Sequence, residues 1–63
     1  MNLTMKQARI GIGATQADMA YKMGIHVQTY ANLERNPDKV TIAQAIRFAE
    51  LTGHSVVDIF FYK

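Results

Sequence analysis

Residues 16 to 35, with the sequence QADMAYKMGIHVQTYANLER, form two short helical patterns separated by Gly24. Ala20 is small enough for a second helix to cross closely, and Gly24 can adopt the left-handed conformation that ends a helix. The large apolar residues fall where two such helices would touch: Met19, Met23, Ile25, Tyr30 and Leu33. The segment therefore predicts two helices, over 16–23 and 27–35, joined by a tight turn.

The other face of the second predicted helix has no role in a core and carries Val27, Gln28, Ala31 and Asn32. Gln28 can make a bidentate contact to adenine, Asn32 can reach an adenine or a phosphate, and the apolar pair can pack against thymine methyl groups. An ordinary solvated face has a similar composition, but the adjoining apolar seam favours a base-reading surface. We interpret residues 16–35 as a helix-turn-helix motif that binds double-stranded DNA through the major groove.

The chain has 63 residues, which predicts a single domain over 1–63. A domain of this size buries only about 60% of its unfolded surface, so its core is marginal. No cysteine is present to form a disulfide. We expect stability to come from helix packing, from dimerisation, or from both.

The absence of cysteine fits a cytoplasmic protein, and the charge favours an anionic partner. The net charge is +2 and the isoelectric point is about 9.2, a small excess of positive charge. Residues 1–12 carry Lys6 and Arg9 in a polar pattern that does not resemble a signal peptide. No apolar run approaches the roughly 20 residues that span a bilayer, so no membrane association is expected.

Capping signals predict an all-α fold with five helices, near 5–12, 16–23, 27–35, 42–52 and 56–61. A hydroxyl residue is followed three residues later by Gln or Asp at four places, a spacing typical of capping boxes: Thr4/Gln7, Thr15/Asp18, Thr41/Gln44 and Ser55/Asp58. Pro37 disfavours helix at Asn36 and separates two halves of the chain. The fourth helix is expected to end at Gly53 and to bury Ile42, Ala45, Ile46 and Ala49, with Phe48 and Leu51 widening that face.

The chain resembles the helix-turn-helix domains of the Cro and phage-repressor (XRE) family. The matching motifs are Thr-Gln-Ala-Asp-Met-Ala at 15–20, Gly-Ile at 24–25, Tyr-Ala-Asn-Leu-Glu-Arg at 30–35 and Gly-His-Ser-Val at 53–56. The resemblance covers nearly the whole chain. It implies a compact five-helix, lambda-repressor-like domain that binds operator DNA as a symmetric dimer.

The resemblance also implies roles for individual residues. Arg9 and Glu34 match a structural ion pair between the first and third helices. It implies phosphate contacts by Gln16, Asn36 and Lys39. From the residues themselves, we also expect phosphate contacts by Arg35, which could take guanine but lies at the helix end, by His26, and secondarily by Thr15, whose hydroxyl can be used in capping. Lys6 and Lys22 are expected to be solvated charges.

Two residues depart from the family pattern. His26 stands where a Ser or Thr usually caps the third helix, and imidazole is a poor N-cap. Its three readings are a DNA contact, a neutral partial cap and a solvated side chain. Tyr30 is larger than the usual aliphatic residue at its position. Either the two helices lie slightly further apart, or the hydroxyl reaches the edge of the seam between them.

The apolar C-terminal segment suggests an interface. Val56 and Ile59 are expected to face the core, whereas Val57, Phe60 and Phe61 cannot all do so because they lie on different sides of the helix. We expect these three residues to form a homodimer interface. The alternative is that Phe60 and Phe61 fold back over the small core, and Phe60 can also serve both roles.

The predicted function is that of a DNA-binding transcriptional regulator, most simply a phage or mobile-element repressor. The alternative is an antitoxin-like module whose C-terminal helix binds a partner protein. The two histidines and five scattered carboxylates form no nucleophile–base pair and no metal-ligand spacing, so we expect no enzyme activity, no metal, no cofactor and no small-molecule ligand.

Overall fold

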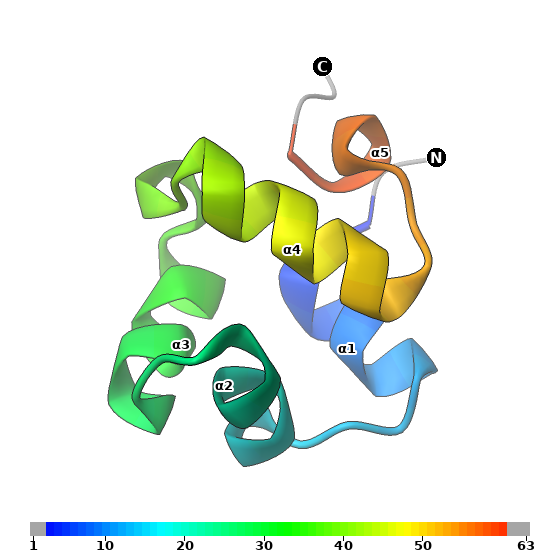
Figure 1. The fold of residues 1–63 in the computed structure, drawn as a ribbon. Helices are drawn as coiled ribbons and strands as arrows, with labels where there is room; N and C mark the ends of the chain where they lie inside the picture. Colours follow the sequence, from blue (N-terminus) through cyan, green and yellow to red (C-terminus); the bar gives the residue numbers. More distant parts are fainter. Residues whose placement is uncertain (1–2, 61–63) are drawn as a thin grey trace.

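The computed structural model describes residues 3–60 and is all-α over that range, as predicted. Five α-helices and one short 3₁₀ helix follow one another along the chain (Figure 1). Their bounds are α1 Met5–Gly11, α2 Gln16–Met23, α3 Val27–Arg35, η1 Pro37–Lys39, α4 Ile42–Thr52 and α5 Val56–Phe60. Within the described residues, no helix has the length and apolar character needed to cross a membrane.

Three predicted capping boxes are present. Thr4, Thr15 and Thr41 each accept a hydrogen bond from the backbone N–H three residues later, and the side chain at that later position accepts one from the threonine N–H. At the fourth start, the Ser55 hydroxyl accepts from the N–H of Val57, 3.2 Å away. The N–H of Asp58 donates to the backbone carbonyl of Ser55 at 3.1 Å.

Glycines end two helices as expected. Gly24 has φ 71° and Gly53 has φ 77°, both in the left-handed region, which costs a residue with a Cβ more than it costs glycine. One boundary was predicted wrongly, because Ile12 lies just outside α1 as its C-cap. The predicted break after Arg35 is present, and within it Pro37 starts a 3₁₀ turn, since the first turn of a helix needs no proline N–H.

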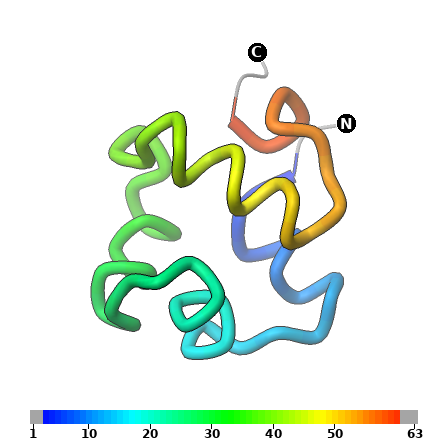
Figure 2. The backbone as a smooth tube through the Cα atoms, in the orientation of Figure 1, coloured from blue at the N-terminus to red at the C-terminus, as the bar shows by residue number. Residues whose placement is uncertain are grey.

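The core lies where α4 crosses the other helices. In Figure 2 the yellow-green α4 runs between the α2–α3 pair and the C-terminal helix, and it packs against α1, α2 and α5. Fully buried Phe48 stacks on Tyr30 of α3, with ring centroids 6.4 Å apart, and contacts the edge of Phe60 at 6.1 Å. The remaining core members are Met5, Ala8, Met19, Ala20, Leu33 and Ile59.

The predicted buried face of α4 was partly wrong. Ile42 is 70% exposed and Ile46 is 46% exposed. The buried stripe is instead Ala45, Phe48, Ala49 and Thr52. Both stripes satisfy the helical period, and the structure selects the one that places Phe48 between Tyr30 and Phe60. The Thr52 hydroxyl is compatible with burial because it donates to the Phe48 carbonyl at 3.0 Å.

Candidate nucleic-acid interface

Helix α3 has one buried face and one exposed face. Tyr30 and Leu33 are buried in the core, whereas Val27, Gln28 and Asn32 are exposed. Ala31 is half-buried on the same outer side. The structure therefore leaves the four predicted base-reading residues accessible along about one and a half turns of α3.

His26 is the N-cap of α3. Its Nδ1 atom accepts a hydrogen bond from the N–H of Gln28 at 3.1 Å, so Nδ1 carries no proton in this arrangement. A neutral ring then has its proton on Nε2 and retains one donor. Of the three readings of His26, the structure supports the partial cap, and the Nε2–H remains available for a contact outside the helix.

The C-terminal end of α3 is polar. Arg35 donates to Oδ1 of Asn32, so an expected phosphate contact and an expected base contact touch each other. Asn36 is the C-cap, and its backbone N–H donates to the Asn32 carbonyl at 2.9 Å. These residues are exposed, as is Lys39 at the end of η1. The turn that follows α3 therefore continues the polar outer surface of the helix.

The residues expected to contact phosphate near α2 are already hydrogen-bonded within the protein. The Thr15 hydroxyl accepts from the N–H of Asp18 at 3.0 Å. Gln16 is half-buried, and its Nε2 donates to Oε1 of Glu34 at 3.0 Å. An amide has two donor hydrogens and an acceptor oxygen, so this bond leaves Gln16 with further capacity.

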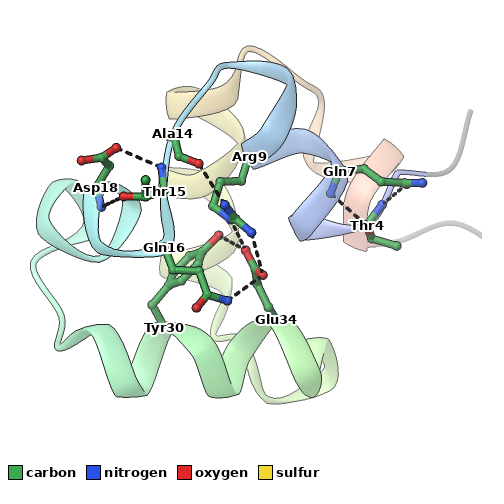
Figure 3. Close-up of polar contacts among 9 residues, drawn as sticks. All are labelled: Thr4, Gln7, Arg9, Ala14, Thr15, Gln16, Asp18, Tyr30 and Glu34. Carbon is green, nitrogen blue, oxygen red and sulfur yellow. Dashed lines mark hydrogen bonds and ion pairs between the residues drawn. The ribbon is translucent and has the colours of Figure 1, made fainter.

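Glu34 is the centre of a hydrogen-bonded cluster that joins three helices (Figure 3). Arg9 of α1 donates from Nε to Oε2 at 2.7 Å, with a longer contact of 3.5 Å from its second nitrogen to Oε1. The Tyr30 hydroxyl also donates to Oε2 at 2.7 Å. The side chains of Arg9 and Glu34 are only 12% and 6% exposed. Arg9 also donates to the Ala14 carbonyl at 2.9 Å, so it holds the start of α2 as well as α3.

The cluster keeps its carboxylate ionised. Burial by itself would raise the pKa of Glu34, but hydrogen bonds from Arg9, Tyr30 and Gln16, together with the positive charge of Arg9, lower the pKa below its ordinary value. The hydrogen bond to Glu34 raises the pKa of Arg9. Burial, followed by the bond to Glu34, raises the pKa of Tyr30, so that its hydroxyl remains a donor.

Sequence reasoning implied the Arg9–Glu34 pair but missed two members of the cluster. Tyr30 and Glu34 are four residues apart, a spacing that places two side chains on the same face of a helix. That spacing could have predicted the hydrogen bond between them. The bond from Gln16 could not have been found in this way, because it depends on how α2 and α3 pack.

The expected interface residues of the C-terminal helix differ in exposure. Val57 is 58% exposed, whereas Phe60 is half-buried against Phe48. Phe60 therefore covers the core, which corresponds to the alternative expectation for that residue. Phe61 lies outside the described residues. Exposed Ile42 and half-buried Phe60 line a shared cavity of about 410 Å³ between α4 and α5.

The described residues do not form a candidate metal site, because no group of three His, Cys, Asp or Glu side chains comes together between positions 3 and 60. Asp18 serves a helix cap, and Glu34 and Glu50 each belong to an ion pair. The polar surface of α3 offers hydrogen-bonding groups for recognition.

Comparison with known protein families matches a helix-turn-helix family over residues 5–59. No curated protein and no solved structure gives a significant match. The matched region spans α1 to α5 and includes the exposed face of α3 and the Arg9–Glu34 cluster. The chain belongs to the Cro/C1-type (XRE) helix-turn-helix family of DNA-binding transcription regulators.

Proposed function

We propose that this chain is a repressor of phage or mobile-element type that binds an inverted-repeat operator as a dimer. The observation that carries the proposal is the division of α3 into two faces. Tyr30 and Leu33 hold the helix to the core, and the opposite side presents an amide, a second amide and small apolar groups. These groups match adenine edges and thymine methyls, so we infer that Val27, Gln28, Ala31 and Asn32 read A·T-rich positions.

Contacts to the sugar-phosphate backbone would orient α3 in the groove. We assign this role to Gln16 at the start of α2, to Arg35 and Asn36 at the end of α3, and to Lys39. We assign the same role to His26. Its Nδ1 is used in capping, which leaves the Nε2–H free to donate to a phosphate oxygen. The Thr15 hydroxyl is engaged in capping, so its role in phosphate binding is secondary.

A dimer would place two copies of α3 in successive major grooves, about 34 Å apart. Val57 is the exposed apolar residue of α5, and Ile42 adds a second exposed apolar side chain at the start of α4. We propose that the dimer interface includes Val57, Phe60 and Phe61, with Ile42 at its edge. An intracellular, cytoplasmic location follows from a function on DNA.

The test begins with selection of bound duplexes from a random pool at stated salt, followed by affinity measurements on the selected site and its single-base variants. Gln28→Ala should lose discrimination at one base pair, worth about 1–3 kcal/mol there, and leave the other positions unchanged. Lys39→Ala should weaken all duplexes by a similar factor. Identical behaviour of the two variants across all duplexes would contradict the assigned roles.

A second candidate is an antitoxin-like module that binds a partner protein. The exposed side chains of Ile42, Ile46 and Val57 favour this candidate, because exposed apolar residues on so small a domain can contact a partner protein. The two functions predict different assemblies. A stable homodimer of the purified chain supports the repressor, whereas a monomer that becomes stable only with a co-expressed partner supports the antitoxin.

A further inference from the structure

A cavity of about 360 Å³ lies where α1, α2 and α3 meet. Its lining contains three cations and one carboxylate, so positive charge predominates. The lining residues are Lys6, Arg9, Gln16, Ala31, Glu34 and Arg35. The cavity therefore combines a member of the base-reading face, Ala31, with a lysine of α1 that sequence reasoning treated as an ordinary solvated charge.

The carboxylate of Glu34 is already committed to Arg9. Their 2.7 Å ion pair is one of two recorded within residues 3–60, and the other joins Arg47 to Glu50. Lys6 and Arg35 thus have no carboxylate partner in the described part of the chain, and both side chains are exposed. Two positive charges without a carboxylate partner in that part of the chain therefore line the cavity and create a local potential that attracts an anion.

The position of the cavity indicates which anion would occupy it. Ala31 and Arg35 lie on the same side of α3 as Gln28 and Asn32, so a duplex read by that face passes next to the opening. Lys6 and Arg35 line the cavity and are exposed, which suits a group on a polymer that passes over it. Lys6 supplies three donors and Arg35 a planar fork, and both bind phosphate oxygens well.

We propose that Lys6 and Arg35 together bind one phosphate of the DNA backbone at this cavity, so that α1 contacts DNA alongside α2 and α3. The inference rests on the proposed function. It assigns Lys6 a role in binding and predicts that the footprint extends by a contact made from the first helix. Arg9 remains structural, because its guanidinium is held by Glu34 and by the Ala14 carbonyl.

The test compares Lys6→Ala with Lys22→Ala on the selected duplex over a range of salt. Both variants remove one exposed lysine charge, but Lys22 lies on α2 outside the cavity, where its charge acts on Asp18. Lys6→Ala should lower the magnitude of the log–log salt slope by about 0.9, so that its affinity deficit shrinks about 3.5-fold between 50 and 200 mM salt. Lys22→Ala should keep the wild-type slope, and Lys6→Arg should restore it.

A neutral methylphosphonate placed at each backbone position in turn would identify the bound phosphate. One substitution should weaken the wild-type protein and have no further effect on Lys6→Ala. The inference would be overturned if Lys6→Ala and wild type had equal salt slopes, or if Lys6→Ala and Lys22→Ala lost equal affinity for the duplex. Binding of free inorganic phosphate at the cavity, seen as shifted amide resonances near Ala31, without any change in the DNA slope of Lys6→Ala, would also overturn it.

The outcomes separate this inference from the proposed function. Failure of the wild-type protein to prefer any duplex would refute the function itself. Sequence-selective binding with an unchanged Lys6→Ala slope would refute only the cavity assignment. Lys6 is exposed and outside the core, so matched thermal unfolding of wild type and Lys6→Ala verifies that a changed slope does not reflect a changed fold.

Discussion

Replacement of Tyr30 by Phe tests whether the Glu34 cluster stabilises the domain. The substitution removes one hydroxyl that donates to Oε2 of Glu34 at 2.7 Å, and it keeps the ring that stacks on Phe48. A hydrogen bond to a charged group contributes about 1.5–3 kcal/mol. Because Arg9 still donates to the same oxygen, we expect the free energy of unfolding to fall by an amount near the lower end of that range, about 2 kcal/mol. In a domain of this size that corresponds to a melting temperature lower by about 8–16 °C.

The loss should also depend on pH in a defined direction. The pKa of Glu34 is lowered in the folded protein, so its contribution is present above the unfolded value of 4.5 and is lost as the pH falls through the folded value. Removal of the Tyr30 donor raises the folded pKa of Glu34. The difference in stability between wild type and Tyr30→Phe should therefore be largest near neutral pH and shrink as the pH falls below about 4.5.

Urea and thermal unfolding monitored by circular dichroism, at neutral and acidic pH, measure both effects. Tyr21→Phe is the matched control, because Tyr21 is 88% exposed and the same atom is removed. We expect that control to lie within about 0.5 kcal/mol of wild type. In a Glu34→Gln background the cost of Tyr30→Phe should fall to about 1 kcal/mol, since the acceptor is then neutral. A Tyr30→Phe protein as stable as wild type, with the same pH profile, would refute the reasoning.

Two further substitutions test the start of α3 and the proposed dimer. His26→Ala removes the Nδ1 cap and should lower the stability by about 1 kcal/mol in thermal unfolding. His26→Ser supplies a hydroxyl cap and should regain that stability. An alanine variant as stable as wild type would show that the cap contributes nothing. Val57→Glu places a charge at the proposed interface and should convert a dimer into a folded monomer in sedimentation experiments. Tyr21→Glu is the control on α2 and should remain dimeric; dissociation of both variants would point to a general charge effect.

The helix starts could be predicted because their chemistry is local. Thr4, Thr15 and Thr41 each satisfy a backbone N–H three residues away, and that spacing is visible in the sequence. The same holds for the turn at Gly24, whose left-handed conformation suits a residue without a Cβ. The capping by His26 was less visible, because imidazole acts as a cap only when Nδ1 is oriented toward the helix.

The orientation of α4 could not be predicted with the same certainty. Two apolar stripes, one through Ile42 and Ile46 and one through Ala45 and Phe48, both fit the helical period. The choice between them depends on Tyr30 and Phe60, which are distant in sequence and meet Phe48 only in the folded chain. The wrong prediction for α4 also bears on function. The exposed stripe contains Ile42, which we add to the surface proposed for dimerisation.

The position of the reading face depends on how α3 is rotated about its own axis. Apolar burial is non-directional, so Tyr30 and Leu33 bring the helix to the core without fixing that rotation closely. The Glu34 carboxylate is directional, because it accepts from Arg9 of α1 at 2.7 Å and from Gln16 of α2 at 3.0 Å. A rotation of α3 that exposed a different face to DNA would break both bonds and strand a buried charge. The buried side of α3 therefore determines which side chains its outer side can present.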